Sequence, residues 1–358
     1  MTGSPDNILV VNPGSSSIKF RLYSRDGILE EGDIETKSTL GIRKSVEMLY
    51  DRIKKYDVKR FAYRVVYGNF KSPKVINRRL LSEISKLREF DPLHTDKTVY
   101  IIKFLMKKLG GKHLACFDSY FHRTMPDKAN MYALPPELSA KYRIKRYGFH
   151  GLAHESLYRD AERFSGKKYK RVISCQLGSG VSLCAIRNGK SIDTTMGFTP
   201  LEGLMMETRS GDIDPAVIPF LNRRGMSIEK IKNILEKDSG LFGVSGIKNS
   251  KDIIHQRRKN PKARLAFKMF VYHVRKAIGA YIAALGGVDL IVLGGGISRS
   301  KDVREKVLEG LEEFGIRIDK KKIKGKTPVK VSSGKVDIIV LETDEQKLIF
   351  ELAKRFFK

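Results

Sequence analysis

A chain of 358 residues is long enough for two domains, and its 41% hydrophobic and 30% charged residues are ordinary for a globular protein. The formal net charge of +29 predicts a surface that attracts anions such as nucleotides, acyl phosphates or RNA. The basic residues are spread along the sequence and no RNA-binding motif accompanies them, so we expect a lysine-rich solvated surface and no nucleic-acid partner.

Three cysteines, Cys116, Cys175 and Cys184, lie in apolar strand-like runs. A small and odd number of such residues indicates reduced, buried thiols rather than disulfides or a zinc site. Residues 1–7 lack the pattern of a secretory signal, and the most apolar region, 277–297, is interrupted by glycines and an aspartate. The sequence therefore predicts a cytoplasmic protein without a membrane span.

The first predicted strand, 8–11, runs into a small-residue turn at 12–19 and a second strand at 20–23. Such a turn lets backbone amides approach a phosphate, with hydroxyls and a lysine to help. At this point a phosphate-binding hairpin and an ordinary Gly/Ser hairpin both remain open.

Apolar periodicity then predicts helices at 43–54, 80–90 and 96–109, and strands at 61–68 and 113–117. The last of these strands ends at Asp118, a position that suits a metal ligand and equally a helix cap.

The pattern of strand, Gly/Ser turn and strand returns at 172–186, and each copy is followed by a second turn, at 25–27 and at 187–189. Two related hairpins, one in each half, predict a duplicated architecture. The repeat places a domain boundary near Tyr147.

The remaining predicted elements are helices at 227–236, 262–284, 301–314 and 344–358 and strands at 288–293, 330–332 and 336–341. Glycines at 294–296, ahead of a helix, expose backbone where a phosphate could bind. In helix 262–284 the residues at helical spacing that we expect in the core are Leu265, Phe267, Phe270, Val271, Val274, Ile278 and Ile282.

The most informative stretch is 196–215, which is apolar and broken by Gly and Pro before it delivers Arg209, Asp212 and Asp214. Charges in apolar surroundings are costly unless they pair or face a ligand. An Arg–Asp pair that fixes a turn and an arginine that binds phosphate or carboxylate are both compatible with the pattern.

Stretch 196–215 closely resembles the acetate kinase family, whose segment differs only in having Gly where this chain has Glu207. The resemblance runs from Ile8 to the final helix. It implies an α/β fold of the actin–sugar kinase superfamily: a duplicated actin-like, ribonuclease H-like two-domain fold with an interdomain cleft. It also implies an N-terminal acyl-kinase domain at 1–147 plus 344–358 and a C-terminal nucleotide-binding domain at 148–343.

The resemblance further implies roles for single residues. Arg64 and Arg209 match two arginines that stabilise the transferring phosphoryl group, as in-line transfer requires. His150 matches a histidine that contacts this group, although a lone histidine here would read as a buried structural one. Asp118 matches an essential aspartate near the metal, and His94 matches a second, less critical histidine.

The ligand contacts follow by the same resemblance. Asn12 and Glu345 match the site of Mg²⁺, with Mn²⁺ as an alternative. The residues that match the contacts of the ATP co-substrate are Asn12, Ser15, Ser17, Lys19, Gln176, Gly178, Ser179, Gly180, Gly295, Gly296 and Ile297. Those that match the small apolar acyl pocket are Val66, Leu93, Phe149 and Pro200.

Departures from the family gather on the nucleotide side. Gln176 replaces His, Ser179 replaces Asn, segment 246–252 lacks the family's Asp-Phe-Arg, and segment 296–300 carries Arg299. The acceptor side therefore matches the family better than the donor side.

The resemblance implies an enzyme, an acetate kinase that transfers a phosphoryl group reversibly from ATP to acetate, giving acetyl phosphate and ADP by direct in-line transfer. We expect acetate to be preferred over propionate, and the family implies a homodimer. Two alternatives remain open: a short-chain acyl kinase with pyrophosphate or another nucleotide as donor, and a non-catalytic basic binding protein derived from the family.

Overall fold

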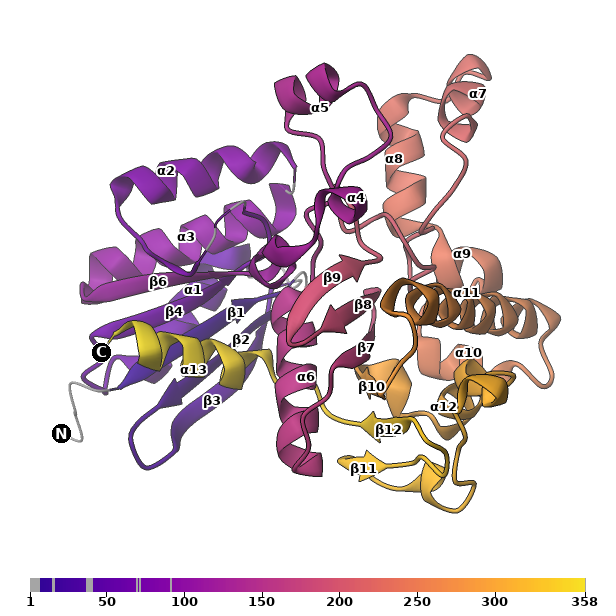
Figure 1. The fold of residues 1–358 in the computed structure, drawn as a ribbon. Helices are drawn as coiled ribbons and strands as arrows, with labels where there is room; N and C mark the ends of the chain where they lie inside the picture. The colour runs from indigo at the N-terminus through magenta and orange to yellow at the C-terminus, as the bar shows by residue number, and fades with distance from the viewer. Residues whose placement is uncertain are drawn as a thin grey trace. The chain divides into compact units, whose positions relative to one another are not determined.

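The computed structural model describes residues 7–14, 17–36, 41–68, 70, 72–90 and 92–357, with residues 92 and 93 described by their backbone only. The chain forms two compact units (Figure 1). Unit 1 comprises Met1–Tyr120 and Asp344–Lys358, and unit 2 comprises Phe121–Thr343. No helix in the described ranges combines the length and apolarity that crossing a bilayer requires.

Unit 1 is built on one mixed sheet in the order β3-β2-β1-β4-β6-β5. Its strands are β1 (Ile8–Pro13), β2 (Ser17–Tyr23), β3 (Ile28–Glu35), β4 (Arg60–Val65), β5 (Lys74–Val75) and β6 (Lys112–Phe117). Its helices are α1 (Gly41–Ile53), α2 (Arg78–Lys86), η1 (Leu87–Glu89), α3 (Pro92–Leu109) and α13 (Glu345–Phe356). The helix η2 (Asp118–Thr124) follows β6 directly.

Strand β1 lies at the centre of this unit. It runs antiparallel to β2 and parallel to β4, and β4 runs parallel to β6. Every position of β1 is buried, because helices cover both faces of the sheet, with α13 packed against β1 and β4 (Figure 1). Apolar side chains of α1 and α3 complete the core cluster against the strands. The carboxyl ends of β1, β4 and β6 therefore meet at one edge.

Unit 2 holds a second sheet, in the order β11-β12-β10-β7-β8-β9. Its strands are β7 (Arg171–Leu177), β8 (Val181–Arg187), β9 (Lys190–Thr194), β10 (Leu290–Gly294), β11 (Val329–Lys330) and β12 (Asp337–Val340). Its longer helices are α6 (Gly151–Ser165), α8 (Ile228–Lys237), α11 (Pro261–Leu285) and α12 (Lys301–Leu308). The shorter ones are α4 (Asp127–Asn130), α5 (Pro136–Tyr142), α7 (Val217–Arg223), α9 (Gly240–Ser245), α10 (Ser250–Gln256), η3 (Gly296–Arg299), η4 (Glu312–Phe314) and η5 (Lys322–Lys324).

The two sheets confirm the predicted duplication. The order β3-β2-β1-β4-β6 in unit 1 is repeated as β9-β8-β7-β10-β12 in unit 2. In both, the first two strands of the repeat pair antiparallel and the next neighbour pairs parallel. The register shifts at equivalent places, between Leu22 and Tyr23 and between Ala185 and Ile186. Each sheet thus begins with the hairpin that the sequence predicts.

The compact units divide the chain earlier than the sequence-based boundary after Tyr147. Residues 121–147 belong to unit 2 because His122 hydrogen-bonds Ser191, at 2.8 Å, and the backbone N–H of Tyr147 donates to Gly197 O at 3.1 Å. The segment from Asp344 onward packs in unit 1, where the sequence-based assignment also put it.

Three expectations about single elements were wrong. The helix expected at 301–314 ends at Leu308, because Glu309 has extended backbone and Gly310 a positive φ of 80°. Leu265 is 53% exposed rather than in the core, although the other six expected core residues of α11 are buried. Helix α3 begins at Pro92, earlier than predicted. The three cysteines are buried thiols, as expected.

Candidate functional site

The first Gly/Ser turn connects β1 to β2 in unit 1. The Gly14 N–H donates to Ser17 O at 2.8 Å, which closes the turn, and Lys19 on β2 is exposed. Ser15 lies outside the described residues. The buried ammonium of Lys97, from α3, donates to Gly14 O at 2.7 Å and fixes the turn from below. Sequence reasoning missed Lys97, whose only signal is a lysine at an inward position of an amphipathic helix.

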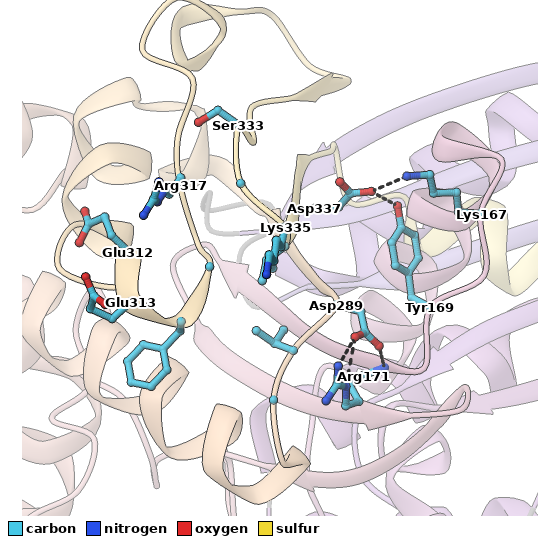
Figure 2. A pocket seen from close by; sticks show the side chains of 16 residues that line it. Lys167, Tyr169, Arg171, Asp289, Glu312, Glu313, Arg317, Ser333, Lys335 and Asp337 are labelled. Atoms are coloured by element: carbon cyan, nitrogen blue, oxygen red, sulfur yellow. Dashed lines mark hydrogen bonds and ion pairs between the residues drawn. The ribbon is translucent and has the colours of Figure 1, made fainter.

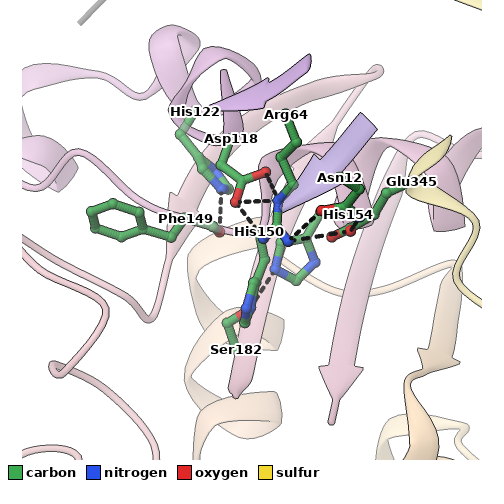
Figure 3. Close-up of polar contacts among 9 residues, drawn as sticks. All are labelled: Asn12, Arg64, Asp118, His122, Phe149, His150, His154, Ser182 and Glu345. Carbon is green, nitrogen blue, oxygen red and sulfur yellow. Dashed lines mark hydrogen bonds and ion pairs between the residues drawn. The ribbon is translucent and has the colours of Figure 1, made fainter. Parts of the chain in front are cut away.

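A charged group forms where β1, β4 and β6 end (Figure 3). Arg64 donates from Nη2 to Asp118 Oδ2 at 2.6 Å and from Nε to both carboxylate oxygens at 3.1 Å. Its Nη1 donates to Asn12 Oδ1 at 3.2 Å and lies 3.4 Å from Glu345 Oε2. Three predicted site residues thus meet around the guanidinium of a fourth, Arg64, in the place where open α/β sheets bind ligands.

Asp118 is the most buried member of this group, with an exposed fraction of 0%. Burial raises the pKa of its carboxyl, and the nearby Arg64 opposes that rise. Glu345 adds to the rise, whereas His94, on α3, acts against it. His94 itself is half-buried near the start of α3.

The donor set of this group fits a magnesium ion of the kind that keeps most of its water. Asn12 Nδ2 donates to Glu345 Oε2 at 2.7 Å, so amide and carboxylate are held side by side. In the described part of the chain, no three His, Cys, Asp or Glu side chains are grouped so that they could hold a metal ion by themselves.

The second Gly/Ser turn connects β7 to β8 in unit 2. The Gly178 N–H donates to Gly180 O at 3.1 Å, and Ser179 is exposed at the tip. Gln176 Oε1 accepts from Thr343 Oγ1 at 2.7 Å, so the residue that replaces the family's histidine is tied to the chain after β12.

Glu207, the other departure, lies on this side as well. Its N–H donates to Ser179 O at 3.1 Å, and its Oε1 accepts from Ser250 N at 3.2 Å. Glu207 thus links the second turn, through its backbone, to the start of α10, through its carboxylate, within the segment where the family's adenosine motif is missing.

His150 begins α6 in a left-handed conformation, with φ 58°. The backbone just before His150 packs closely against the His122 ring. Gly148 has φ 73°, and a Cβ built there would lie 2.7 Å from that ring. His122 Nε2 donates to Phe149 O at 3.0 Å. A strained non-glycine residue that its surroundings hold in place is typical of functional sites.

His150 and Arg209 approach the second turn at the same residue. A Cβ built on Gly180 would lie 3.0 Å from His150 Cε1 and 3.8 Å from Arg209 Nη1. Arg209 Nη1 also donates to Pro200 O at 3.4 Å. Asp212, by contrast, accepts from the Gly203 N–H at 2.7 Å and so stabilises the turn of stretch 196–215.

The third glycine loop follows β10 and lies against the second turn. Gly295 has φ 84°, and a Cβ there would lie 2.5 Å from the carbonyl of Leu177, so only glycine permits this approach. Ile297 is buried behind the loop. Arg299 pairs with Glu342 at 3.0 Å on the surface.

The predicted acyl-pocket residues are distributed over both units. Val66 is half-buried after β4, Phe149 is fully buried, and Pro200 is half-buried. The side chain of Leu93 lies outside the described part of the chain.

Sequence reasoning also missed the polar side chains behind His150. Ser182 Oγ lies 2.8 Å from His150 Nδ1 and 2.8 Å from His154 Nε2 (Figure 3). His122 and His154 are both buried. The signal for them is weak, because a buried histidine on a helix reads as core until the strand that faces it is known.

A cavity of about 910 Å³ lies elsewhere in unit 2, at the amino ends of β7, β10 and β12 (Figure 2). Its walls carry both signs of charge, with Arg171 paired to Asp289 at 2.5 Å and Asp337 bonded to Tyr169 at 2.7 Å. No predicted site residue is among its described lining residues, and it lies at the opposite end of the strands from the glycine turns.

Comparisons with known proteins point to one family. The sequence model of the Acetokinase family matches residues 30–351. An acetate kinase from Brachyspira hyodysenteriae is 38% identical, over 97% of this chain and 100% of that protein. An acetate kinase from Campylobacter jejuni is 37% identical, over 95% and 96%.

Solved structures give the same result. The acetate kinase of Porphyromonas gingivalis superposes with a TM-score of 0.89 at 32% identity, covering 99% of this chain and 100% of that one. A propionate kinase from Francisella tularensis superposes with a TM-score of 0.91 at 31% identity, covering 98% and 99%. Because similarity in sequence and in fold extends over nearly the whole length, this chain belongs to the acetokinase family.

Proposed function

We propose that the protein is an acetate kinase, which transfers the γ-phosphoryl group of ATP to acetate and forms acetyl phosphate and ADP reversibly. Similarity to acetate kinases over nearly the full length supports this. The observation that carries most weight is the group around Arg64, where two carboxylates and an amide hold one guanidinium at the carboxyl edge of a sheet.

Direct in-line transfer requires little covalent chemistry from the protein. Acetate is ionised at neutral pH, so its oxygen attacks the phosphorus directly and no protein base is needed. As the bond to ADP breaks, charge spreads over the equatorial oxygens of the phosphoryl group. We assign Arg64 and Arg209 to bind these oxygens and His150 to donate a hydrogen bond to one of them. His94 has a lesser, supporting role.

Asp118 holds the Arg64 guanidinium in a fixed orientation through its bidentate pair. We propose that Mg²⁺, or Mn²⁺ as an alternative, is held by Asn12 and Glu345 together with water and nucleotide oxygens. When bound, the metal ion neutralises phosphate charge.

We assign the glycine turns to the nucleotide phosphates, through the backbone and side chains of Asn12, Ser15, Ser17, Lys19, Gln176, Gly178, Ser179, Gly180, Gly295, Gly296 and Ile297. We assign Val66, Leu93, Phe149 and Pro200 to the methyl group of acetate. Because one methylene is worth about 1–3 kcal/mol in a tight apolar site, propionate should be about 10-fold to 100-fold poorer in kcat/KM.

We also propose a cytoplasmic homodimer. The three buried thiols fit a reducing compartment. The family resemblance supports the dimer. Light scattering of the protein as it elutes from a size-exclusion column tests it, and a mass equal to one chain would contradict it.

The decisive experiment traps acyl phosphate with hydroxylamine from acetate, Mg²⁺ and a donor, with ATP, GTP and pyrophosphate in parallel. Arg209→Ala should lower activity with ATP by about 100-fold to 1000-fold, the cost of losing one preorganised charge donor. Arg317→Ala is the matched control, because Arg317 lines the cavity at the opposite strand ends and should leave activity unchanged.

Activity with another donor alone would show that ATP is not the donor and would support the alternative of a kinase that uses pyrophosphate or another nucleotide. If the folded protein forms no acyl phosphate with any of the three donors, the proposed function is refuted.

A further inference from the structure

A continuous chain of hydrogen bonds runs from His150 into the interior of unit 2 (Figure 3). Ser182 Oγ, on β8, lies 2.8 Å from His150 Nδ1 and 2.8 Å from His154 Nε2. His154 Nδ1 lies 2.9 Å from Ser174 Oγ, on β7. The chain therefore links the proposed phosphoryl contact to two buried serines and a second histidine.

His154 is neutral in this chain of hydrogen bonds. Its side chain is fully buried, and burial, together with the nearby His122 and His150, lowers its pKa well below the usual value. A neutral imidazole carries one N–H, so it donates to one serine and accepts from the other. The two hydrogen bonds of His154 consequently run in the same direction, and the single hydroxyl proton of Ser182 can continue that direction to His150.

The direction decides which nitrogen of His150 carries a proton. If Ser174 donates to His154, then His154 donates to Ser182, and the Ser182 hydroxyl donates to His150 Nδ1. A neutral His150 then carries its proton on Nε2. The reverse direction places a proton on Nδ1, and a neutral His150 would then present a bare Nε2. Phosphoryl oxygens only accept hydrogen bonds, so a neutral His150 can serve them only in the first case.

We infer that Ser182 and His154 are positioning residues, which set the tautomer of His150 so that its Nε2–H points outward as a hydrogen-bond donor to the transferring phosphoryl group. This inference rests on the proposed function for the identity of the acceptor. The proton on His150 is held in place and is not transferred, so His150 can return unchanged after each turnover.

A second serine–histidine pair, Ser191 and His122, serves as a control. Ser191 lies on β9, the strand next to β8. His122 Nδ1 lies 2.8 Å from Ser191 Oγ, and His122 Nε2 lies 3.0 Å from the carbonyl of Phe149. Burial lowers the pKa of His122 to about 4, so this ring is neutral as well. A carbonyl only accepts, so His122 must carry its proton on Nε2 even when Ser191 is replaced. Ser191→Ala thus removes a buried serine hydroxyl from a histidine whose tautomer does not depend on it.

The test reads the tautomer directly, by ¹⁵N NMR of histidine-labelled protein without substrates. In the wild type, His150 should show a protonated Nε2 and an unprotonated Nδ1. In Ser182→Ala it should show a mixture of both tautomers, whereas Ser191→Ala should leave the His150 signals unchanged. A wild-type His150 protonated at Nδ1, or at both nitrogens, would overturn the inference.

Kinetics of acetyl phosphate formation supply the second readout. Ser182→Ala should lower kcat by about 3-fold to 10-fold, the usual effect of one hydrogen bond, with little change in the KM for acetate. Ser182→Thr, which keeps the hydroxyl, should recover part of the loss. Ser174→Ala, at the far end of the chain, should give a smaller loss and keeps the inference testable if Ser182→Ala does not fold.

Equal losses in Ser182→Ala and Ser191→Ala would mean that buried packing alone is responsible, and would refute the inference. A wild-type protein without kinase activity would refute the proposed function instead, because the NMR assignment of His150 needs no turnover.

Discussion

Removal of Arg64 from its ion pair with Asp118 should be among the most destabilising single substitutions in unit 1. Asp118 is fully buried, and the Arg64 side chain is 14% exposed, so solvent screens their attraction little. Removing one partner of a buried pair costs about 3–5 kcal/mol, because the other charge is left uncompensated. In Arg64→Ala the remaining charge is Asp118, whose buried carboxylate loses the guanidinium that lies 2.6 Å away. We expect a loss of about 3 kcal/mol near neutral pH.

The loss should depend on pH with a defined sign. Burial raises the pKa of Asp118 and Arg64 opposes this, so Arg64→Ala should raise that pKa further. A carboxyl with a higher pKa in the folded state stabilises folding below its unfolded pKa of about 3.9, and this stabilisation is lost as pH rises through the folded pKa. The deficit of the variant should therefore be smallest in acid and grow as the pH is raised.

Urea denaturation followed by circular dichroism, at about pH 5 and about pH 8, measures both effects. Arg21→Ala is the matched control in the same unit. Arg21 also pairs with two carboxylates, Asp344 at 2.8 Å and Glu31 at 2.9 Å, but these are 33% and 59% exposed. Solvent screening limits that loss to about 1 kcal/mol. Equal losses in the two variants, or an Arg64→Ala deficit that does not shrink in acid, would refute the reasoning.

Three further predictions concern the framework of unit 2 and the thiols. Gly148→Ala should cost about 3 kcal/mol or more in thermal unfolding, because its Cβ would lie 2.7 Å from the His122 ring at a positive φ, whereas Gly166→Ala, at φ 68° in open space, should cost only about 1–2 kcal/mol. Asn260→Ala should cost about 1 kcal/mol, because the Asn260 side chain caps two N–H groups of α11, while Ser300→Ala should be nearly neutral, since Ser300 makes no side-chain cap on α12; comparable urea midpoints for the two would contradict this. Burial raises the pKa of two of the three cysteine thiols and covers all three, so a thiol reagent should react with native protein only as fast as it unfolds, and rapid labelling in buffer would speak against this.

Much of the fold could be predicted because its signals are local. Apolar runs predicted β1, β6 and β10, and helical periodicity predicted α11 to within a residue at each end. The antiparallel hairpins were also predictable, because each is a short strand, a small-residue turn and a strand. Strand β3 was missed since its sequence is mostly polar and exposed, and it is a strand only because β2 pairs with it.

The residues of the candidate site likewise include some that the sequence could predict and others that it could not. Arg64, Asp118 and Glu345 could be named from short motifs, and the structure brings them together because β4 and β6 are parallel neighbours and α13 begins beside them. The hydroxyls of Ser174 and Ser182 could not be named, since neither belongs to a motif and each depends on which face of its strand meets α6. Lys97 was hidden for a similar reason, as its contact with Gly14 joins parts of the chain far apart in sequence.

The return of α13 to unit 1 has a consequence for how the protein is made. Unit 2 is continuous in sequence, but unit 1 needs residues that the ribosome delivers only after all of unit 2. Until then β1 and β4 lack the helix that packs on them, and Arg64 lacks Glu345. Unit 2 should therefore fold first on the ribosome although it is encoded second, and the charged group at Arg64 should be completed last, when translation of the final helix ends.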